Sequence, residues 1–432
     1  MTLTSRRILF AFFVAAFVIA GVIVIYYTRG YRFDLSTFSI TKTGAVYVEA
    51  QQSGIEILLG KNIYSDKSGL LKKGTLISNV IPKKYTLTIK KDGYFDYQKN
   101  IEVLPSQVTR IFNIYLVPKE IKPSLALKNL KGDVIIDVSS DGRMLAQDTQ
   151  KGTYYLYNLS DNPVSPINFS SKISALTRQK ILAVWFYPQT DTFIIKTQKG
   201  VYRTDLNAKT VTAIQEGAIG AVEIDGNNLY AVIQNQTVKT KTSPASSVAL
   251  SKISVFDLVL NSKVSEFSLP YESSQIKAVD VAGGLTSLLL SDGSLYLYDS
   301  SGKQTLQIAH SAKRMAVSDD KSKIFFQDND GKTFVYLFNE ELMTLDAGKD
   351  STLRLMLVDT AHIENAWWFP DSFHLLLQYP DKITLAEVTS KDPNENFLIL
   401  NSQQGNAFYS PARKTFYVLN TGNLTGIDAN AL

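Results

Sequence analysis

The chain has 432 residues, a formal net charge of +5 and no cysteine, which excludes disulfides, thiol nucleophiles and a lipid anchor on cysteine. Residues 28–120 carry 14 Lys/Arg against 8 Asp/Glu, whereas residues 121–432 carry 29 against 32. The slightly acidic larger part disfavours nucleic-acid binding, while the basic part could attract anionic lipid head groups or acidic wall polymers, or simply present a solvated β-surface. The roughly 400 residues beyond residue 28 exceed one ordinary core, so two or more domains are expected.

An uninterrupted apolar run, ILFAFFVAAFVIAGVIVIYY, occupies residues 8–27. At about 1.5 Å per helical residue it spans roughly 30 Å, the thickness of the bilayer hydrocarbon core. It predicts an uncleaved signal-anchor helix; the alternative is a signal peptide cleaved after Val18-Ile19-Ala20. The residues expected at the two membrane interfaces are Arg6, Arg7, Tyr26, Tyr27, Arg29, Tyr31 and Arg32.

The orientation of this helix is not decided by charge, because two arginines lie on each side of it. Long domains translocate largely regardless of charge, and no second apolar run of this length follows. The expectation is a cytoplasmic N-terminus at residues 1–7, a linker at residues 28–43 and an extracytoplasmic body anchored in the cell membrane. No amphipathic helix is expected beyond residue 28, so the body should be all-β.

Residues 44–118 predict a small β-sandwich. The segment YTLTIK at residues 85–90 alternates, with Tyr85, Leu87 and Ile89 on one face, and an Asp-Gly turn follows it. The residues Gly54-Ile55-Glu56-Ile57, Gly60, Pro82, Tyr85, Lys91, Gly93-Tyr94 and Val103–Pro105 follow in an order that resembles the PEGA domain of bacterial and archaeal surface proteins. The resemblance implies an adhesion or spacer module with no active site.

The turn after this strand combines basic and aromatic residues, and the possible ligand contacts are Lys91, Tyr94, Phe95 and Tyr97. Such rings could stack on sugars while the lysine binds an acidic group. The preferred interpretation is structural, with Phe95 and Tyr97 on the core face of a hairpin, because aromatics are common in ordinary strands.

Seven similar units follow, each with two apolar strands, a polar turn and an aromatic-rich strand. They occupy residues 133–159, 181–206, 221–258, 276–299, 313–338, 363–388 and 406–428. Their spacing predicts a β-propeller of about seven blades within residues 119–432, and WFPDS at residues 368–372 resembles a turn common in bacterial propellers. Six or eight blades, or a pair of β-sandwiches, are the alternatives.

No catalytic, cofactor or metal site is predicted. The histidines His310, His362 and His374 lack metal-ligand spacing, and there is no G-x-S-x-G or phosphate-binding glycine motif. Asp328-Asn329-Asp330-Gly331 is better explained as a hairpin turn than as a calcium loop. The three tryptophans, Trp185, Trp367 and Trp368, are expected in the core.

The sequence therefore suggests a single-pass, membrane-anchored bacterial envelope protein with a PEGA-like domain and a propeller. The function expected is non-enzymatic binding of an envelope protein or polysaccharide. The alternative is a membrane-tethered glycan-processing enzyme with carboxylates in the propeller channel, which requires at least two Asp or Glu side chains to converge with shifted pKa values.

Overall fold

The computed structural model divides the chain into two compact units, Met1–Glu120 and Ile121–Leu432. The structure describes residues 3–429 except residues 35–37, 70–72, 162–164, 178, 188–191, 206, 208, 234–250, 270, 272–274, 283–284, 300–303, 339–353, 357–362, 389–396 and 402–404.

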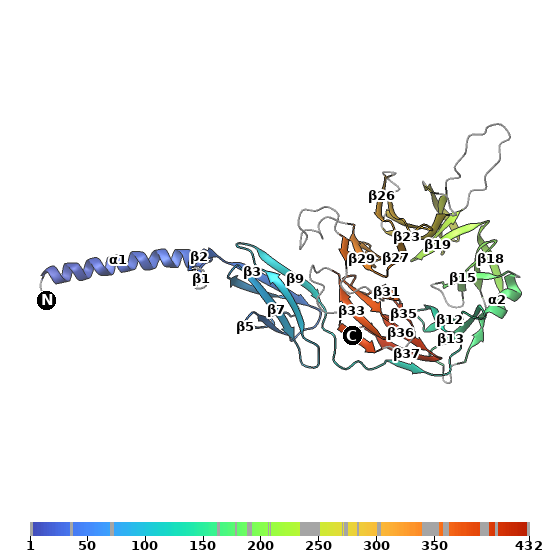
Figure 1. The fold of residues 1–432 in the computed structure, drawn as a ribbon, viewed down its shortest axis with the longest axis horizontal. Helices are drawn as coiled ribbons and strands as arrows, with labels where there is room; N and C mark the ends of the chain where they lie inside the picture. The colour runs from blue at the N-terminus through green and yellow to red at the C-terminus, as the bar shows by residue number, and fades with distance from the viewer. Residues whose placement is uncertain are drawn as a thin grey trace, which may run out of the picture. The chain divides into compact units, whose positions relative to one another are not determined.

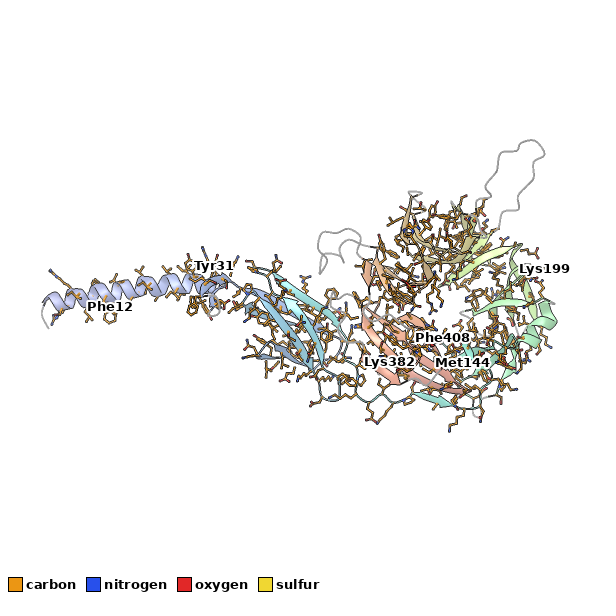
Figure 2. All side chains as sticks on the ribbon, viewed as in Figure 1. Phe12, Tyr31, Met144, Lys199, Lys382 and Phe408 are labelled. Atoms are coloured by element: carbon orange, nitrogen blue, oxygen red, sulfur yellow. The ribbon has the colours of Figure 1, made fainter. Side chains whose placement is uncertain are left out.

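Helix α1 (Leu3–Thr28) contains the whole apolar run. Its apolar side chains lie exposed, as Phe12 does in Figure 2, because no other element of the protein covers them. Within the described residues, Ser5–Thr28 is the one helix long and apolar enough to cross a membrane, with a mean hydropathy of 3.1. A signal sequence would satisfy the same criteria of length and composition.

The segment after α1, residues 28–43, contains a short hairpin. Strands β1 (Tyr31–Asp34) and β2 (Ser39–Lys42) form an antiparallel hairpin within residues 28–43. The Thr43 backbone N–H and its hydroxyl both donate to the Gly30 carbonyl, each at 2.8 Å. The backbone is thus hydrogen-bonded almost directly after the helix ends.

Seven further strands complete the first unit in two sheets. One sheet has the order β5-β4-β7-β8, and the other has the order β6-β3-β9, in which β3 and β9 are parallel. The bounds are β3 (Gly44–Ala50), β4 (Glu56–Leu59), β5 (Asn62–Ser65), β6 (Thr75–Val80), β7 (Lys84–Lys90), β8 (Tyr97–Glu102) and β9 (Val108–Ile114). Leu87 and Ile89 are fully buried and Tyr85 is half-buried, so the alternation predicted for β7 is confirmed.

The described residues of the second unit form seven four-stranded antiparallel sheets, numbered here as blades 1–7 in chain order (Figure 1). Blade 1 has β11 (Val134–Val138), β12 (Arg143–Asp148), β13 (Thr153–Asn158) and β14 (Ile167–Asn168); blade 2 has β15 (Ile181–Phe186), β16 (Thr192–Thr197), β17 (Gly200–Asp205) and β18 (Thr210–Glu216). Blade 3 has β19 (Ile219–Asp225), β20 (Asn228–Ile233), β21 (Lys252–Asp257) and β22 (Ser262–Ser268); blade 4 has β23 (Ile276–Ala282), β24 (Leu285–Leu290), β25 (Leu295–Asp299) and β26 (Gln304–Ala309). Blade 5 has β27 (Ala312–Val317), β28 (Lys323–Asp328), β29 (Thr333–Leu337) and β30 (Arg354–Met356); blade 6 has β31 (Asn365–Trp368), β32 (His374–Gln378), β33 (Lys382–Glu387) and β34 (Phe397–Asn401). Blade 7 has β35 (Asn406–Ser410), β36 (Thr415–Asn420), β37 (Asn423–Asp428) and, as its outermost strand, β10 (Leu125–Leu127) from the start of the unit.

The blades close into a ring. Shared clusters of buried side chains join each of blades 1 to 5 with the next blade. The Trp367 ring of blade 6 lies 5.7 Å from the Phe416 ring of blade 7. Blade 7 in turn shares a cluster with blade 1, and the Ser410 hydroxyl donates to the Val138 carbonyl at 3.0 Å. Four-stranded sheets packed face to face around a ring constitute a β-propeller, here with seven blades, so the sandwich alternative is wrong.

One helix in the second unit was not expected. Helix α2 (Phe169–Thr177) follows β14, and the side-chain oxygen of Asn168 caps it by accepting from the Ser171 N–H at 3.0 Å. Phe169 and Ile173, one turn apart, are fully buried in the cluster between blades 1 and 2. The helix is too short to show a periodic pattern, and its packing on the sheet stabilises it.

Candidate functional site

The residues predicted at the membrane interfaces lie at the two ends of α1. Arg6 and Arg7 are exposed in its first turns. At the other end the Arg32 guanidinium lies 3.5 Å above the Tyr27 ring and donates to the Tyr27 carbonyl at 2.8 Å. The Tyr26 and Tyr31 rings contact edge to face at 5.3 Å, at the point labelled Tyr31 in Figure 2.

The remaining interface residue, Arg29, lies in the turn after the helix, where its N–H donates to the Ile25 carbonyl at 3.1 Å. The structure therefore gathers Tyr26, Tyr27, Tyr31 and Arg32 into one aromatic and basic cluster. Clusters of this composition are typical of membrane–water interfaces.

The Lys91 turn brings together two of its four predicted contact residues, Lys91 and Tyr94. The Lys91 ammonium donates to the Ser53 carbonyl at 2.9 Å and lies 5.1 Å from the centre of the Tyr94 ring. Phe95 is 37% exposed, so its expected place on the core face is wrong. Tyr97 is buried opposite Ile89, as the structural interpretation predicts, and it cannot contact a ligand.

The tryptophans divide between core and surface. Trp368 is buried, and its indole N–H donates to the Ala316 carbonyl of blade 5 at 2.9 Å. Trp185 and Trp367 are only half-buried, so the expectation of core placement holds fully for Trp368 alone.

Carboxylates on the innermost strands connect neighbouring blades. Asp137 of blade 1 accepts from the Phe186 N–H of blade 2 at 3.1 Å, and Asp280 of blade 4 accepts from the Val317 N–H of blade 5 at 2.8 Å. Burial raises the pKa of both carboxyls, and these backbone hydrogen bonds oppose the rise. Both side chains are therefore engaged in holding the ring together.

Glu223 of blade 3 is a third inner-strand carboxyl, without such an inter-blade bond. Burial first, and then the nearby negative charge of Asp280, raise its pKa to about 8, although Lys321 opposes the rise. Lys321 itself pairs with Asp225, with 3.3 Å between the ammonium and the carboxylate. Glu223 consequently holds its proton at neutral pH and can both donate and accept hydrogen bonds.

A pocket of about 460 Å³ opens beside Glu223 on the inner strands of blades 2, 3 and 4. Its chemically distinctive lining residues are Trp185, Lys196 and Glu223. The Lys196 ammonium donates to the Gly220 carbonyl, and burial lowers its pKa. The other lining residues are a second lysine, Lys277, and the small or apolar residues Ala183, Gly220, Ala221, Val222, Ile276, Ala278 and Val279.

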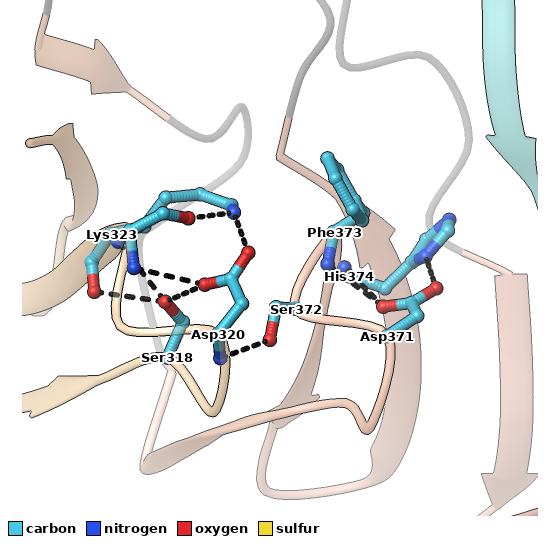
Figure 3. Close-up of polar contacts among 8 residues, drawn as sticks. Ser318, Asp320, Lys323, Asp371, Ser372, Phe373 and His374 are labelled. Atoms are coloured by element: carbon cyan, nitrogen blue, oxygen red, sulfur yellow. Dashed lines mark hydrogen bonds and ion pairs between the residues drawn. The ribbon is translucent and has the colours of Figure 1, made fainter. Parts of the chain in front are cut away.

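A polar cluster between blades 5 and 6 resembles a functional site in composition, but its role is structural (Figure 3). Lys323 is completely buried, and its ammonium contacts the Asp320 carboxylate and the Ser322 hydroxyl, each at 2.7 Å. The Asp320 N–H donates to the Ser372 hydroxyl of blade 6 at 3.1 Å. Each polar group therefore has its partner inside the protein, and the cluster ties the two blades together.

The described residues contain no group of three His, Cys, Asp or Glu side chains that could hold a metal ion. His374 lies 2.6 Å from the Asp371 carboxylate, His310 lies 2.9 Å from Gln307, and His362 falls outside the described residues. In the Asp328 turn the carboxylate accepts from the N–H groups of Asp330 and Lys332, so the hairpin interpretation is confirmed.

The sequence interpretation missed Lys196 and Glu223, and it assigned Trp185 to the core. A signal was present in the repeats: Asp137, Glu223 and Asp280 each fall in the first strand of a unit, where a purely apolar residue would be expected. Acidic residues in apolar strands indicate either an inter-blade bond or a pocket. Which of the two applies depends on the neighbouring blade.

No protein-family model matches this sequence, and no curated protein matches it. Among solved structures, the chain is similar to a chain of "Crystal Structure of Mitotic Checkpoint Complex" at 12% identity, with a TM-score of 0.46. The similarity covers 72% of this chain and 94% of that chain.

Proposed function

We propose that this chain is a membrane-anchored, non-enzymatic binding protein whose propeller binds a saccharide unit of an envelope polysaccharide. Helix α1 is the single-pass anchor, the PEGA-like β-unit is a spacer, and the propeller lies outside the cytoplasm. The aromatic and basic cluster around Tyr27 and Arg32 supports the anchor, because it matches the composition of a membrane interface.

The pocket on blades 2, 3 and 4 carries the proposal. The half-buried Trp185 ring offers an apolar face on which a sugar ring can stack. The protonated Glu223 and the Lys196 ammonium lie around it and can hydrogen-bond hydroxyl or carboxylate groups of the sugar. A mostly preformed pocket with a few polar groups is the usual form of a small-ligand site.

Binding is favoured over hydrolysis because Glu223 is the one carboxyl among the described residues that line this pocket. Glycoside hydrolysis ordinarily needs two carboxyl groups flanking the scissile bond. The carboxyl that raises the pKa of Glu223 most is Asp280, which already accepts the Val317 N–H. The raised pKa of Glu223 nevertheless suits a general acid, so glycan processing stays the second candidate.

Titration of the full chain in detergent with soluble cell-wall polysaccharide fragments tests the proposal. We expect Trp185→Ala to weaken binding by tenfold or more, on the order of 1.4 kcal/mol. Trp367→Ala is the matched control, because Trp367 is also half-buried on an inner strand but packs against Phe416. Equal loss in both variants, or no binding by the wild type, would contradict the proposal.

The same samples test the second candidate. Release of reducing ends from the fragments, abolished by Glu223→Gln, would establish catalysis in place of simple binding. We expect neither the wild type nor Glu223→Gln to release reducing ends. The wild type should bind the fragments equally well before and after the incubation.

A further inference from the structure

A second concavity lies in the Met1–Glu120 unit, where the β4–β5 turn and the β6–β7 turn face each other. Its volume is about 620 Å³. Three exposed lysines, Lys61, Lys83 and Lys84, line it, and none of the described residues in its lining carries a carboxylate. The lining residues, called here the lysine groove, are Leu59, Gly60, Lys61, Asn62, Tyr64, Asn79, Val80, Ile81, Lys83, Lys84, Tyr85 and Thr86.

Tyr85 forms the floor of the lysine groove. Its hydroxyl donates to the Ile81 carbonyl at 2.9 Å, and the Lys83 ammonium lies 5.1 Å from its ring centre. Burial and the nearby Tyr64 and Asp34 raise the pKa of Tyr85, so the phenol stays neutral and adds no negative charge. Among the described residues, none of the three lysines forms an ion pair with a carboxylate.

The lysine groove lies at the end of the unit where the chain leaves α1. The helix ends at Thr28, and the Gly30 carbonyl accepts from the Thr43 N–H. The next residue, Gly44, pairs with Val80, which lines the groove. Asp34 of the β1–β2 hairpin is close enough to act on Tyr85.

Other lysines of this unit lie at its opposite end. Lys73 precedes Thr75, which pairs with Val48, four residues further along β3 than Gly44. Four residues of strand correspond to roughly 13 Å. The Lys119 N–H donates to the Gly93 carbonyl of the Lys91 turn, at the far end of β7 from Lys84.

We infer that the lysine groove binds the phosphate headgroup of an anionic phospholipid at the membrane surface from which α1 emerges. The inference rests on the proposed membrane anchor. Lysines that form no ion pair beside a membrane helix are attracted to anionic headgroups. The nearby Asp34 carboxylate is buried and is not part of the groove lining. Headgroup binding would hold the β-unit against the membrane surface and so restrict the position of the chain that follows it.

The test uses the full chain in lipid nanodiscs of phosphatidylcholine, with and without phosphatidylglycerol as about a third of the lipid. Amine acylation of each lysine is followed by mass spectrometry. With phosphatidylglycerol we expect roughly fivefold slower acylation at Lys61, Lys83 and Lys84, reversed in roughly 1 M salt. Lys67, Lys73 and Lys119 are the exposed reference lysines and should react alike in both discs. Lys67 lies at the same end of the unit as Lys73, because its N–H donates to the Thr75 hydroxyl at 2.7 Å.

Native mass spectrometry of detergent-released protein gives the second readout. We expect the triple variant K61Q/K83Q/K84Q to lose phosphatidylglycerol that the wild type and K67Q/K73Q/K119Q retain. Equal acylation in both discs, or equal lipid retention by the two variants, overturns the inference while the anchor stands. Failure of the wild type to enter discs at all contradicts the anchor itself.

Discussion

Replacing Glu223 with glutamine should make the propeller more stable in alkaline solution. The pKa of Glu223 is about 8 in the fold against an ordinary value of 4.5, because burial and Asp280 disfavour its charge. Between these two pH values the unfolded chain binds fewer protons than the folded chain, so the free energy of unfolding falls as pH rises. The full difference corresponds to about 5 kcal/mol at about 1.36 kcal/mol per pH unit.

Between about pH 5 and about pH 8.5, we expect the free energy of unfolding of Glu223→Gln to increase by about 2–4 kcal/mol relative to that of the wild type. Glutamine keeps the shape of the side chain without its charge. Urea unfolding of the full chain in detergent, followed by tryptophan fluorescence, measures this difference. All three tryptophans lie in the propeller, so the signal reports on that unit.

The matched control is Glu216→Gln, because Glu216 is an exposed glutamate at the end of β18 in the neighbouring blade. Its pH profile should follow that of the wild type. Parallel profiles for the wild type and Glu223→Gln would refute the reasoning, since they would show that Glu223 is ionised in the fold at neutral pH.

Two further substitutions test the packing of each unit. Asp320→Ala should destabilise the propeller by about 3–5 kcal/mol, because it leaves the buried Lys323 ammonium without its carboxylate. Chemical denaturation measures this loss of stability, and a loss below about 1 kcal/mol would contradict the prediction. Gly44→Ala should prevent or strongly weaken folding of the first unit, because the new methyl would lie 2.4 Å from the Leu104 carbonyl oxygen. In the control, Gly69→Ala, the new methyl has no atom within 4 Å. Circular dichroism compares the stability of the two variants, and equal stability would be inconsistent with this packing.

The local sequence predicted most of the elements but not all of their partners. The alternation in YTLTIK identified β7 and its buried face, and the repeated units identified the blades. The pairing of β10 with β37 could not be foreseen, because Leu125 and Gly426 are joined only by closure of the ring. Helix α2 could not be predicted, because nine residues carry too little periodicity. Burial of Phe169 and Ile173 stabilises it.

The candidate site was less predictable than the fold. Trp185 was assigned to the core because aromatic residues in strands are usually buried there. It is half-buried because blades 2, 3 and 4 leave a pocket beside it, a consequence of how three sheets pack. In the first unit, Lys61 and Lys84 are separated along the chain and share one groove only because β4 pairs with β7.

By itself, the sequence determined what local chemistry controls: an apolar segment long enough to cross a bilayer, strands that alternate, and a unit repeated seven times. Helix length and strand alternation depend on neighbouring residues, so they can be deduced from composition and periodicity. Only the tertiary structure decided which inner-strand carboxyl is free to face a pocket. Asp280 accepts a backbone N–H from the next blade, whereas Glu223 lies beside Asp280 and stays protonated. The charge of a carboxyl depends on its burial and on charges distant in sequence, and both arise only when the blades pack together.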